Sequence, residues 1–192
     1  VPGHTSEEHP WFVESGKEHP VAPYDHRYIW TENAFCRGDG MPFIGGEKPR
    51  DGTYIINFFK CQPALNYGFY KTTAPWQKSF RDASALATRE AIKDVMRFWL
   101  GLGCDGFRVD MADSLVKNDD EKIATSKIWA DIRKMMDKDY PECALVSEWC
   151  NPQRSINNGG FHMDFYLDHY GNGYSRLFRY LVDGENKSFF SD

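Results

Sequence analysis

The sequence predicts an α/β protein, because helical and strand-like segments alternate along its middle. Apolar residues recur at helical spacing from about 84 to 100, and a short strand is predicted at 107–111. A second helical pattern at 119–138 precedes another short apolar strand at 144–147. Two strands that are joined by a helix of this length must be parallel neighbours. We therefore expect a helix, strand, helix, strand unit with a parallel sheet.

Length and composition narrow the class of protein. The 192 residues are enough for one ordinary domain with a core, and the chain is 41% hydrophobic and 27% charged with a net charge of −5. No cluster of Lys and Arg could follow phosphates or anionic lipids, so neither a nucleic acid nor a membrane surface is expected as a partner. The longest apolar runs are well below the roughly 18 residues that a membrane span needs.

Cysteine and histidine patterns predict neither a disulfide framework nor a metal site. The five cysteines have no Cys-x-x-Cys spacing, and the odd number slightly favours a reducing compartment, the cytoplasm. Four of the six histidines lie in the first thirty residues, without a His-Glu-x-x-His or Cys/His zinc pattern. A loop rich in polar residues is the better interpretation of that region.

The first third of the chain is predicted to be mostly irregular. Residues 13–53 are expected to form an inserted loop, because glycine and proline recur throughout 38–52. A loop of this length inside a compact domain is usually functional. Residues 53–60 are rich in β-branched and aromatic side chains, which indicates a short strand or an extended buried segment.

The first long helix is predicted to have one core face and one solvated face. It is expected to end at Gly101 and Gly103. The predicted core face consists of Ile92, Val95, Met96, Trp99 and Leu100, and the predicted solvated face of Arg89, Glu90, Lys93, Asp94 and Arg97.

The second helix, at 119–138, shows the same kind of pattern, followed by weaker signals. Its apolar face would hold Ile128, Ile132, Met135 and Met136. A third strand is a candidate at 161–167, where His162 and Asp164 would share one face, and a terminal helix is a candidate at 174–182.

Two carboxylates are expected at one edge of the sheet. Arg108 and Asp110 lie two residues apart on a strand, so their side chains leave the same face, and Glu148 follows the next strand. Functional groups of parallel α/β proteins gather at the carboxyl ends of strands. Two carboxylates there suit glycoside hydrolysis, with one as nucleophile and one as proton donor, and the arginine would keep its neighbour ionised. A structural ion pair is the alternative.

The motifs resemble those of one known family. Residues 106–110 (Gly-Phe-Arg-Val-Asp) look like the nucleophile motif of the α-amylase family, glycoside hydrolase family 13, and residues 147–149 (Ser-Glu-Trp) look like its general acid/base motif. The opening residues, 1–12, are similar to the segment after the third barrel strand, and 57–66 also fit. These motifs occur in the family's order with fitting spacing over most of residues 1–170.

The resemblance implies a fold and a mechanism. The fold would be a partial (β/α)8 TIM barrel, roughly strands three to six, with residues 1–192 as a fragment of the catalytic domain and 13–53 as the inserted loop. The activity would be that of a retaining α-glycoside hydrolase that acts on α-glucans or α-glucosides by double displacement. Carried over by position, Asp110 would be the nucleophile, Glu148 the acid/base, and Arg108 and His4 sugar-binding residues.

Two departures from the family's pattern limit these expectations. Gly3 stands where the family usually has an asparagine that helps to bind calcium, so no calcium or other cofactor is expected. The family's third carboxylate has no counterpart before Asp192, so the chain by itself is expected to be inactive. A partial barrel would also expose sheet edges and apolar surface, which favours self-association.

Alternatives to simple hydrolysis stay open. A transglycosylase of the same family, of the trehalose synthase or sucrose-active type, would use the same residues. A non-catalytic fragment or relative is the other alternative, and the retention of both Asp110 and Glu148 argues against a non-catalytic relative. In each catalytic case the partner is an oligosaccharide or polysaccharide α-glucan.

Overall fold

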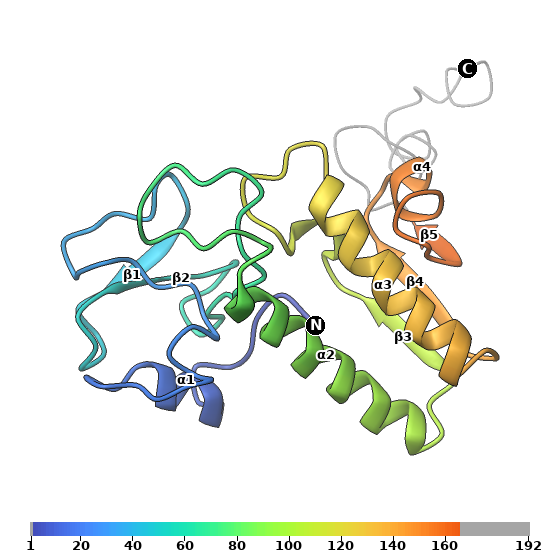
Figure 1. Ribbon diagram of the computed structural model, residues 1–192, viewed down its shortest axis with the longest axis horizontal. Helices are drawn as coiled ribbons and strands as arrows, with labels where there is room; N and C mark the ends of the chain where they lie inside the picture. Colours follow the sequence, from blue (N-terminus) through green and yellow to red (C-terminus); the bar gives the residue numbers. More distant parts are fainter. Residues whose placement is uncertain (1, 166–192) are drawn as a thin grey trace, which may run out of the picture.

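The computed structural model describes residues 2–165, in which a loop-rich region lies beside a helix and strand unit (Figure 1). The predicted helix at 174–182 lies outside the described residues, as does the end of the predicted third strand. The elements are α1 (Pro10–Ser15), β1 (Phe43–Gly45), β2 (Thr53–Ile55), α2 (Ala83–Gly101), β3 (Gly106–Val109), a 3-10 turn (Ala112–Ser114), α3 (Ile123–Asp139), β4 (Ala144–Glu148), α4 (Pro152–Ser155) and β5 (Met163–Phe165).

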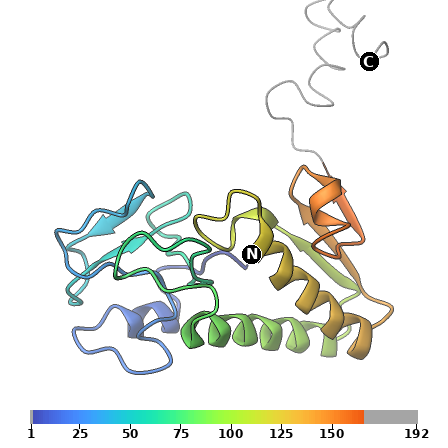
Figure 2. The same cartoon turned by 45° about the horizontal axis from the view of Figure 1, so that its top comes forward.

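The predicted parallel pairing is confirmed. Within residues 2–165, β3, β4 and β5 form a parallel sheet in that order, which Figure 2 shows from a second direction. Val109 pairs with Ser147, and Ser147 pairs with Asp164. The register therefore brings the ends of β3 and β4 together at one edge. The sheet of the described residues is open, so the α/β class is established without a closed barrel.

Helix α2 forms as predicted, but its faces differ from the prediction. Asp82 caps its first turn by accepting a hydrogen bond from the backbone N–H of Ser84 at 2.9 Å. Val95 and Trp99, predicted as core, are 42% and 48% exposed. The reason is their place beside the open edge of β3, where an apolar pocket of about 330 Å³ separates α2 from β3. Only part of the apolar stripe reaches the core.

Lys93 is a second correction, because it was predicted to be solvated and is 7% exposed. Its Nζ lies 2.5 Å from Asp131 Oδ2 on α3 and 2.9 Å from Glu90 Oε1 on its own helix. Burial alone would lower the pKa of Lys93, but the contacts with Asp131 and Glu90 outweigh it and raise the pKa. The side chain joins α2 to α3.

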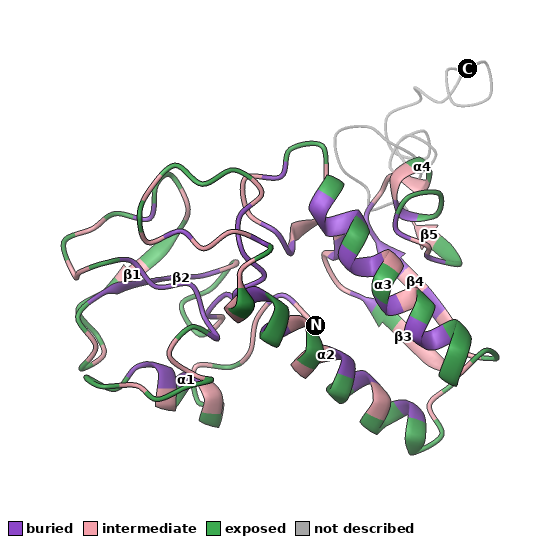
Figure 3. Cartoon of the chain, viewed as in Figure 1, coloured by how far each residue is buried: buried purple, intermediate pink, exposed green. Residues whose placement is uncertain are grey.

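Helix α3 starts four residues later than predicted, because Asp119 caps it from outside. The buried Asp119 carboxylate accepts hydrogen bonds from the backbone N–H groups of Ile123 at 2.9 Å and Thr125 at 2.8 Å. The predicted apolar face is confirmed: Ile128, Ile132, Met135 and Met136 are all buried. As Figure 3 shows, α3 turns buried residues toward the sheet and exposed residues outward.

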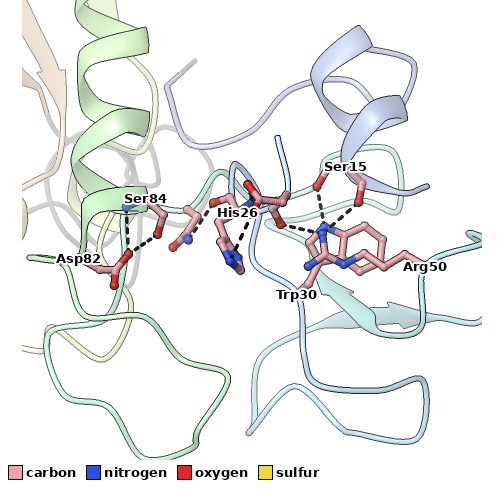
Figure 4. Close-up of polar contacts among 8 residues, drawn as sticks. Ser15, His26, Trp30, Arg50, Asp82 and Ser84 are labelled. Carbon is pink, nitrogen blue, oxygen red and sulfur yellow. Dashed lines mark hydrogen bonds and ion pairs between the residues drawn. The ribbon is translucent and has the colours of Figure 1, made fainter. Parts of the chain in front are cut away.

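The loop-rich region holds more regular structure than the sequence predicts. It contains β1, which pairs with β2 in antiparallel orientation, and β2 is shorter than the strand predicted at 53–60. Side chains bind its loops together (Figure 4): Arg50 Nη1 donates to the carbonyl oxygens of Ser15 at 3.0 Å and Asp25 at 2.7 Å. The Arg50 guanidinium lies over the Trp30 ring, whose Nε1 donates to Ser15 Oγ at 2.9 Å.

No helix in residues 2–165 is both long and apolar enough to span a bilayer.

Candidate active site

The predicted charged pair lies at the end of β3 and contacts the second carboxylate. Arg108 Nη1 is 2.6 Å from Asp110 Oδ1, and Arg108 Nη2 is 2.7 Å from Glu148 Oε2. The Glu148 side chain is 8% exposed, whereas that of Arg108 is 48% exposed. One guanidinium therefore joins both carboxylates, and it faces solvent while Glu148 lies beneath it.

A sharp turn after β3 fixes these positions. Met111 adopts a left-handed conformation with φ of 45° and starts the 3-10 turn. Its backbone N–H donates to Glu148 Oε2 at 3.0 Å. Non-glycine residues seldom adopt this conformation, and such strain is concentrated at functional turns.

The electrostatics favour the ionised form of Asp110. Burial alone would raise the pKa of Asp110, but hydrogen bonds with Glu148 and Arg108 and the charge of Arg108 outweigh it and hold the pKa below its ordinary value. Asp110 is therefore a carboxylate at neutral pH, and it accepts hydrogen bonds.

His4 lies near the carboxylates without a direct hydrogen bond to them. It pairs with Ala64 through an isolated antiparallel bridge, and its Nδ1 is 3.2 Å from Asn57 Nδ2. Burial lowers the pKa of His4, and the negative charge of Asp110 acts in the opposite direction. The ring is therefore neutral at pH 7, within the electrostatic reach of Asp110.

Lys117 and Asn57 belong to the same region and were not predicted as site residues. Lys117 Nζ lies 3.3 Å from Asn57 Oδ1 and 3.3 Å from the carbonyl oxygen of Ser114. Both side chains line a pocket of about 190 Å³ that also contacts Met111 and Phe58. The contact joins residues that are 60 positions apart, so no local pattern could have indicated it.

Lys117 also predicts a pH dependence of stability. Burial, reinforced by the charge of Lys122, lowers its pKa from 10.5 to about 8. The unfolded chain therefore binds more protons than the folded chain between these values, so the free energy of unfolding rises with pH in this window. We expect Lys117 to increase the free energy of unfolding by about 3 kcal/mol between pH 8 and pH 10.5.

Urea unfolding of the wild type and of Lys117→Met at several pH values from 8 to 10.5 isolates this effect. Tyrosines that titrate in the same range are common to both proteins, so the difference between the two curves belongs to Lys117. Parallel curves would show that Lys117 keeps an ordinary pKa.

His162 and Asp164 do not line the charged cluster. His162 precedes β5, and its Nδ1 accepts a hydrogen bond from the backbone N–H of Leu145 at 2.9 Å. Asp164 accepts hydrogen bonds from Ser147 in β4 and from Trp149 and Asn151 just after β4. Their predicted common face does not place either of them in contact with Arg108.

A family model and several known proteins match more than half of the chain. The family model described as the catalytic domain of alpha amylase matches residues 1–177. The chain is 34% identical over 160 residues to trehalose synthase/amylase TreS of Mycobacterium tuberculosis, covering 77% of this chain and 24% of the relative. It is 33% identical over 128 residues to glucan 1,6-alpha-glucosidase of Streptococcus dysgalactiae subsp. equisimilis, covering 64% of this chain and 20% of the relative.

Solved structures resemble the fold at lower identity. A maltogenic amylase from S. marinus aligns with a TM-score of 0.60 at 16% identity, covering all of this chain and 26% of its own. Amy13B of Eubacterium rectale aligns with a TM-score of 0.59 at 21% identity, covering 88% of this chain and 31% of its own. The chain spans about a quarter of the length of the curated relatives that it matches.

Proposed function

This chain belongs to the α-amylase family, and from that premise we propose that it carries the nucleophile and the general acid/base of a retaining α-glycoside hydrolase. The substrates would be α-glucans or α-glucosides. One observation carries the proposal: Arg108 holds Asp110 and Glu148 together at the ends of two adjacent parallel strands. We further assign the chain to roughly strands three to six of a (β/α)8 barrel, with residues 13–53 as its inserted loop.

Asp110 is assigned as the nucleophile and Glu148 as the acid/base. The Asp110 carboxylate attacks the anomeric carbon while Glu148 gives its proton to the leaving glycosidic oxygen, so a covalent glycosyl ester forms and the leaving sugar departs protonated. Glu148 then removes a proton from water, which attacks the anomeric carbon and releases Asp110. Two inversions give net retention of configuration.

Arg108 and His4 support these steps. The low pKa of Asp110 is a property of a nucleophile that must be ionised, and the Arg108 contact at 2.6 Å favours that form. We expect the two carboxyl groups to stand about 5 to 5.5 Å apart when a sugar is bound, as they do in retaining enzymes. We assign the neutral His4 ring to sugar binding.

A calcium ion next to the first motif does not fit the residues present. Gly3 supplies no side-chain oxygen, and a Cβ added there would lie 2.9 Å from Asn57 Nδ2. The Oδ1 atom of Asn57 is already within 3.3 Å of the Lys117 ammonium, which would repel a divalent cation. We therefore propose no calcium ion at this position.

Trapping of the covalent intermediate tests the proposal. The natural protein that contains this sequence is treated with a fluorinated α-glucosyl fluoride, whose glycosyl enzyme hydrolyses slowly, and digested for mass spectrometry. We expect one glucosyl group on the peptide that contains Asp110, and an α-configured first product by NMR with an unmodified substrate. A label on another carboxylate, or a β-configured product, would contradict the assignment.

Transglycosylation is a second candidate, favoured by the similarity to trehalose synthase/amylase TreS. The same glycosyl enzyme would form, but a sugar hydroxyl would attack in place of water. Incubation with maltose separates the two, because trehalose as the first product indicates transglycosylation and glucose alone indicates hydrolysis.

A further inference from the structure

Asp164 contacts the chain on both sides of Glu148. Its Oδ1 accepts hydrogen bonds from Ser147 Oγ at 2.8 Å and from the backbone N–H of Trp149 at 3.0 Å. Its Oδ2 accepts from the backbone N–H of Asn151 at 2.8 Å and from Ser155 Oγ at 2.9 Å. The residue before Glu148 and the residue after it therefore both donate to one carboxylate.

The donor set saturates this carboxylate. Its own strand adds the backbone N–H of Phe165 at 3.0 Å to Oδ1, so five donors meet a group that offers about four lone-pair sites. Ser147 and Ser155 are fully buried, so neither hydroxyl has water as an alternative partner. Loss of the Asp164 acceptor would leave Ser155 Oγ unpaired, which costs more than the loss of a solvated hydrogen bond, whereas Ser147 Oγ would keep the carbonyl oxygen of Met163 at 3.2 Å.

The position of Asp164 follows from the sheet. Asp164 pairs with Ser147 in the β4–β5 register, and β4 ends one residue later, at Glu148. Beyond that point the chain leaves the sheet, so its backbone N–H groups need acceptors outside the ladder. Asp164 is the acceptor for the N–H groups of Trp149 and Asn151. These two hydrogen bonds hold the segment that follows Glu148 in one conformation.

We propose that Asp164 is the positioning residue of the general acid/base, and this inference rests on the function proposed for Glu148. By fixing Ser147 and Trp149, Asp164 sets the direction in which the Glu148 carboxyl leaves the backbone. The opposite side of Glu148 is held by Arg108 and the N–H of Met111, both on the β3 side of the site. Glu148 is therefore held from two neighbouring strands. Arg108 and Met111 bind its carboxylate, whereas Asp164 binds the residues immediately before and after it.

Leaving-group dependence distinguishes positioning from a merely structural role. A glucoside with a poor leaving group, such as maltose, needs protonation by Glu148, whereas a dinitrophenyl α-glucoside does not. In the natural protein, Asp164→Asn replaces one acceptor oxygen by an NH2 group, which cannot accept the hydrogen bonds that the carboxylate receives. We expect kcat/KM to fall roughly 100-fold for maltose, the size of effect that a misplacement of about 1 Å produces. The aryl glucoside should lose less than about threefold.

Ser155→Ala is the matched control, because it removes one donor to Asp164 and leaves the residues next to Glu148 in place. Its ratio of the two rates should equal that of the wild type. Ser147→Ala removes only the hydroxyl donor and should show the same selective loss as Asp164→Asn to a smaller extent. If Asp164→Asn does not fold, the selectivity of Ser147→Ala alone tests the positioning role of Asp164.

Equal losses for both substrates in Asp164→Asn and Ser147→Ala would overturn the inference, as would no loss in either. Glu148→Gln separates this failure from that of the proposed function. If Glu148→Gln lacks leaving-group selectivity, the role of Glu148 fails, and the inference fails with it. If Glu148→Gln is selective while the Asp164 and Ser147 variants are not, only the positioning role fails.

Discussion

Asp110→Asn is expected to reduce kcat for a nitrophenyl α-glucoside by roughly a million-fold, the scale of effect seen when a covalent nucleophile is removed. The amide cannot form the glycosyl ester, yet it has the size of the carboxylate, and its oxygen can still accept from Arg108 Nη1. Kinetics in the natural protein measure the loss. Circular dichroism and the unfolding midpoint should stay close to those of the wild type, because the Asp110 side chain is 28% exposed.

Asp113→Asn is the matched control for this prediction. Asp113 lies three residues further along, on the 3-10 turn, where its carboxylate is 3.4 Å from Lys122 Nζ and outside the Arg108 cluster. Its replacement is expected to change kcat by less than about threefold, since a surface ion pair contributes little. If Asp110→Asn kept most of the wild-type turnover, the nucleophile would have to be sought elsewhere, whatever the control showed.

The parallel unit could be predicted because its signals are local. The 3.6-residue period of α3 and the short apolar strands before Asp110 and Glu148 are properties of neighbouring residues. A helix between two strands leaves little choice but parallel pairing, which the β3 and β4 register confirms. The meeting of Arg108 with both carboxylates follows from that register.

The failed predictions depend on contacts that no local pattern encodes. Val95 and Trp99 fit a core stripe, but burial requires a partner surface, and the edge of β3 next to them is open in residues 2–165. Lys93 was predicted to be solvated because lysine is seldom buried without a partner. Its partner Asp131 lies on another helix and could be identified only from the packing of α2 against α3.

The candidate site likewise contains residues that the sequence predicts and residues that only the structure identifies. Asp110 and Glu148 follow from strand ends and motif resemblance, whereas Asn57 and Lys117 meet across two distant loops. Asp164 was predicted only as a neighbour of His162 on a strand face. The alternation rule does not apply to that pair, because β5 starts at Met163 and His162 precedes it. Its contact with the segment around Glu148 depends on the β4–β5 register, which required the structure.

Gly106→Ala is expected to have the largest effect on stability, because this glycine allows β3 and β4 to approach each other. Gly106 has φ of +147°, and a Cβ added there would lie 2.0 Å from the carbonyl oxygen of Ala144, its partner in the register. Strain of the backbone and displacement of β4 together should lower the free energy of unfolding by about 3 kcal/mol or more. Urea unfolding of the natural protein measures the change.

Gly101→Ala is the control for this prediction, because Gly101 is the last residue of α2 and a Cβ added there meets no atom within 4 Å. Its unfolding free energy should change by less than about 1 kcal/mol, with alanine the better helix former. Equal stability of the two variants would show that β4 can move away from Gly106 at little cost. The register that unites Asp110 with Glu148 would then not be rigid, and both the proposed mechanism and the role of Asp164 would need another source of alignment.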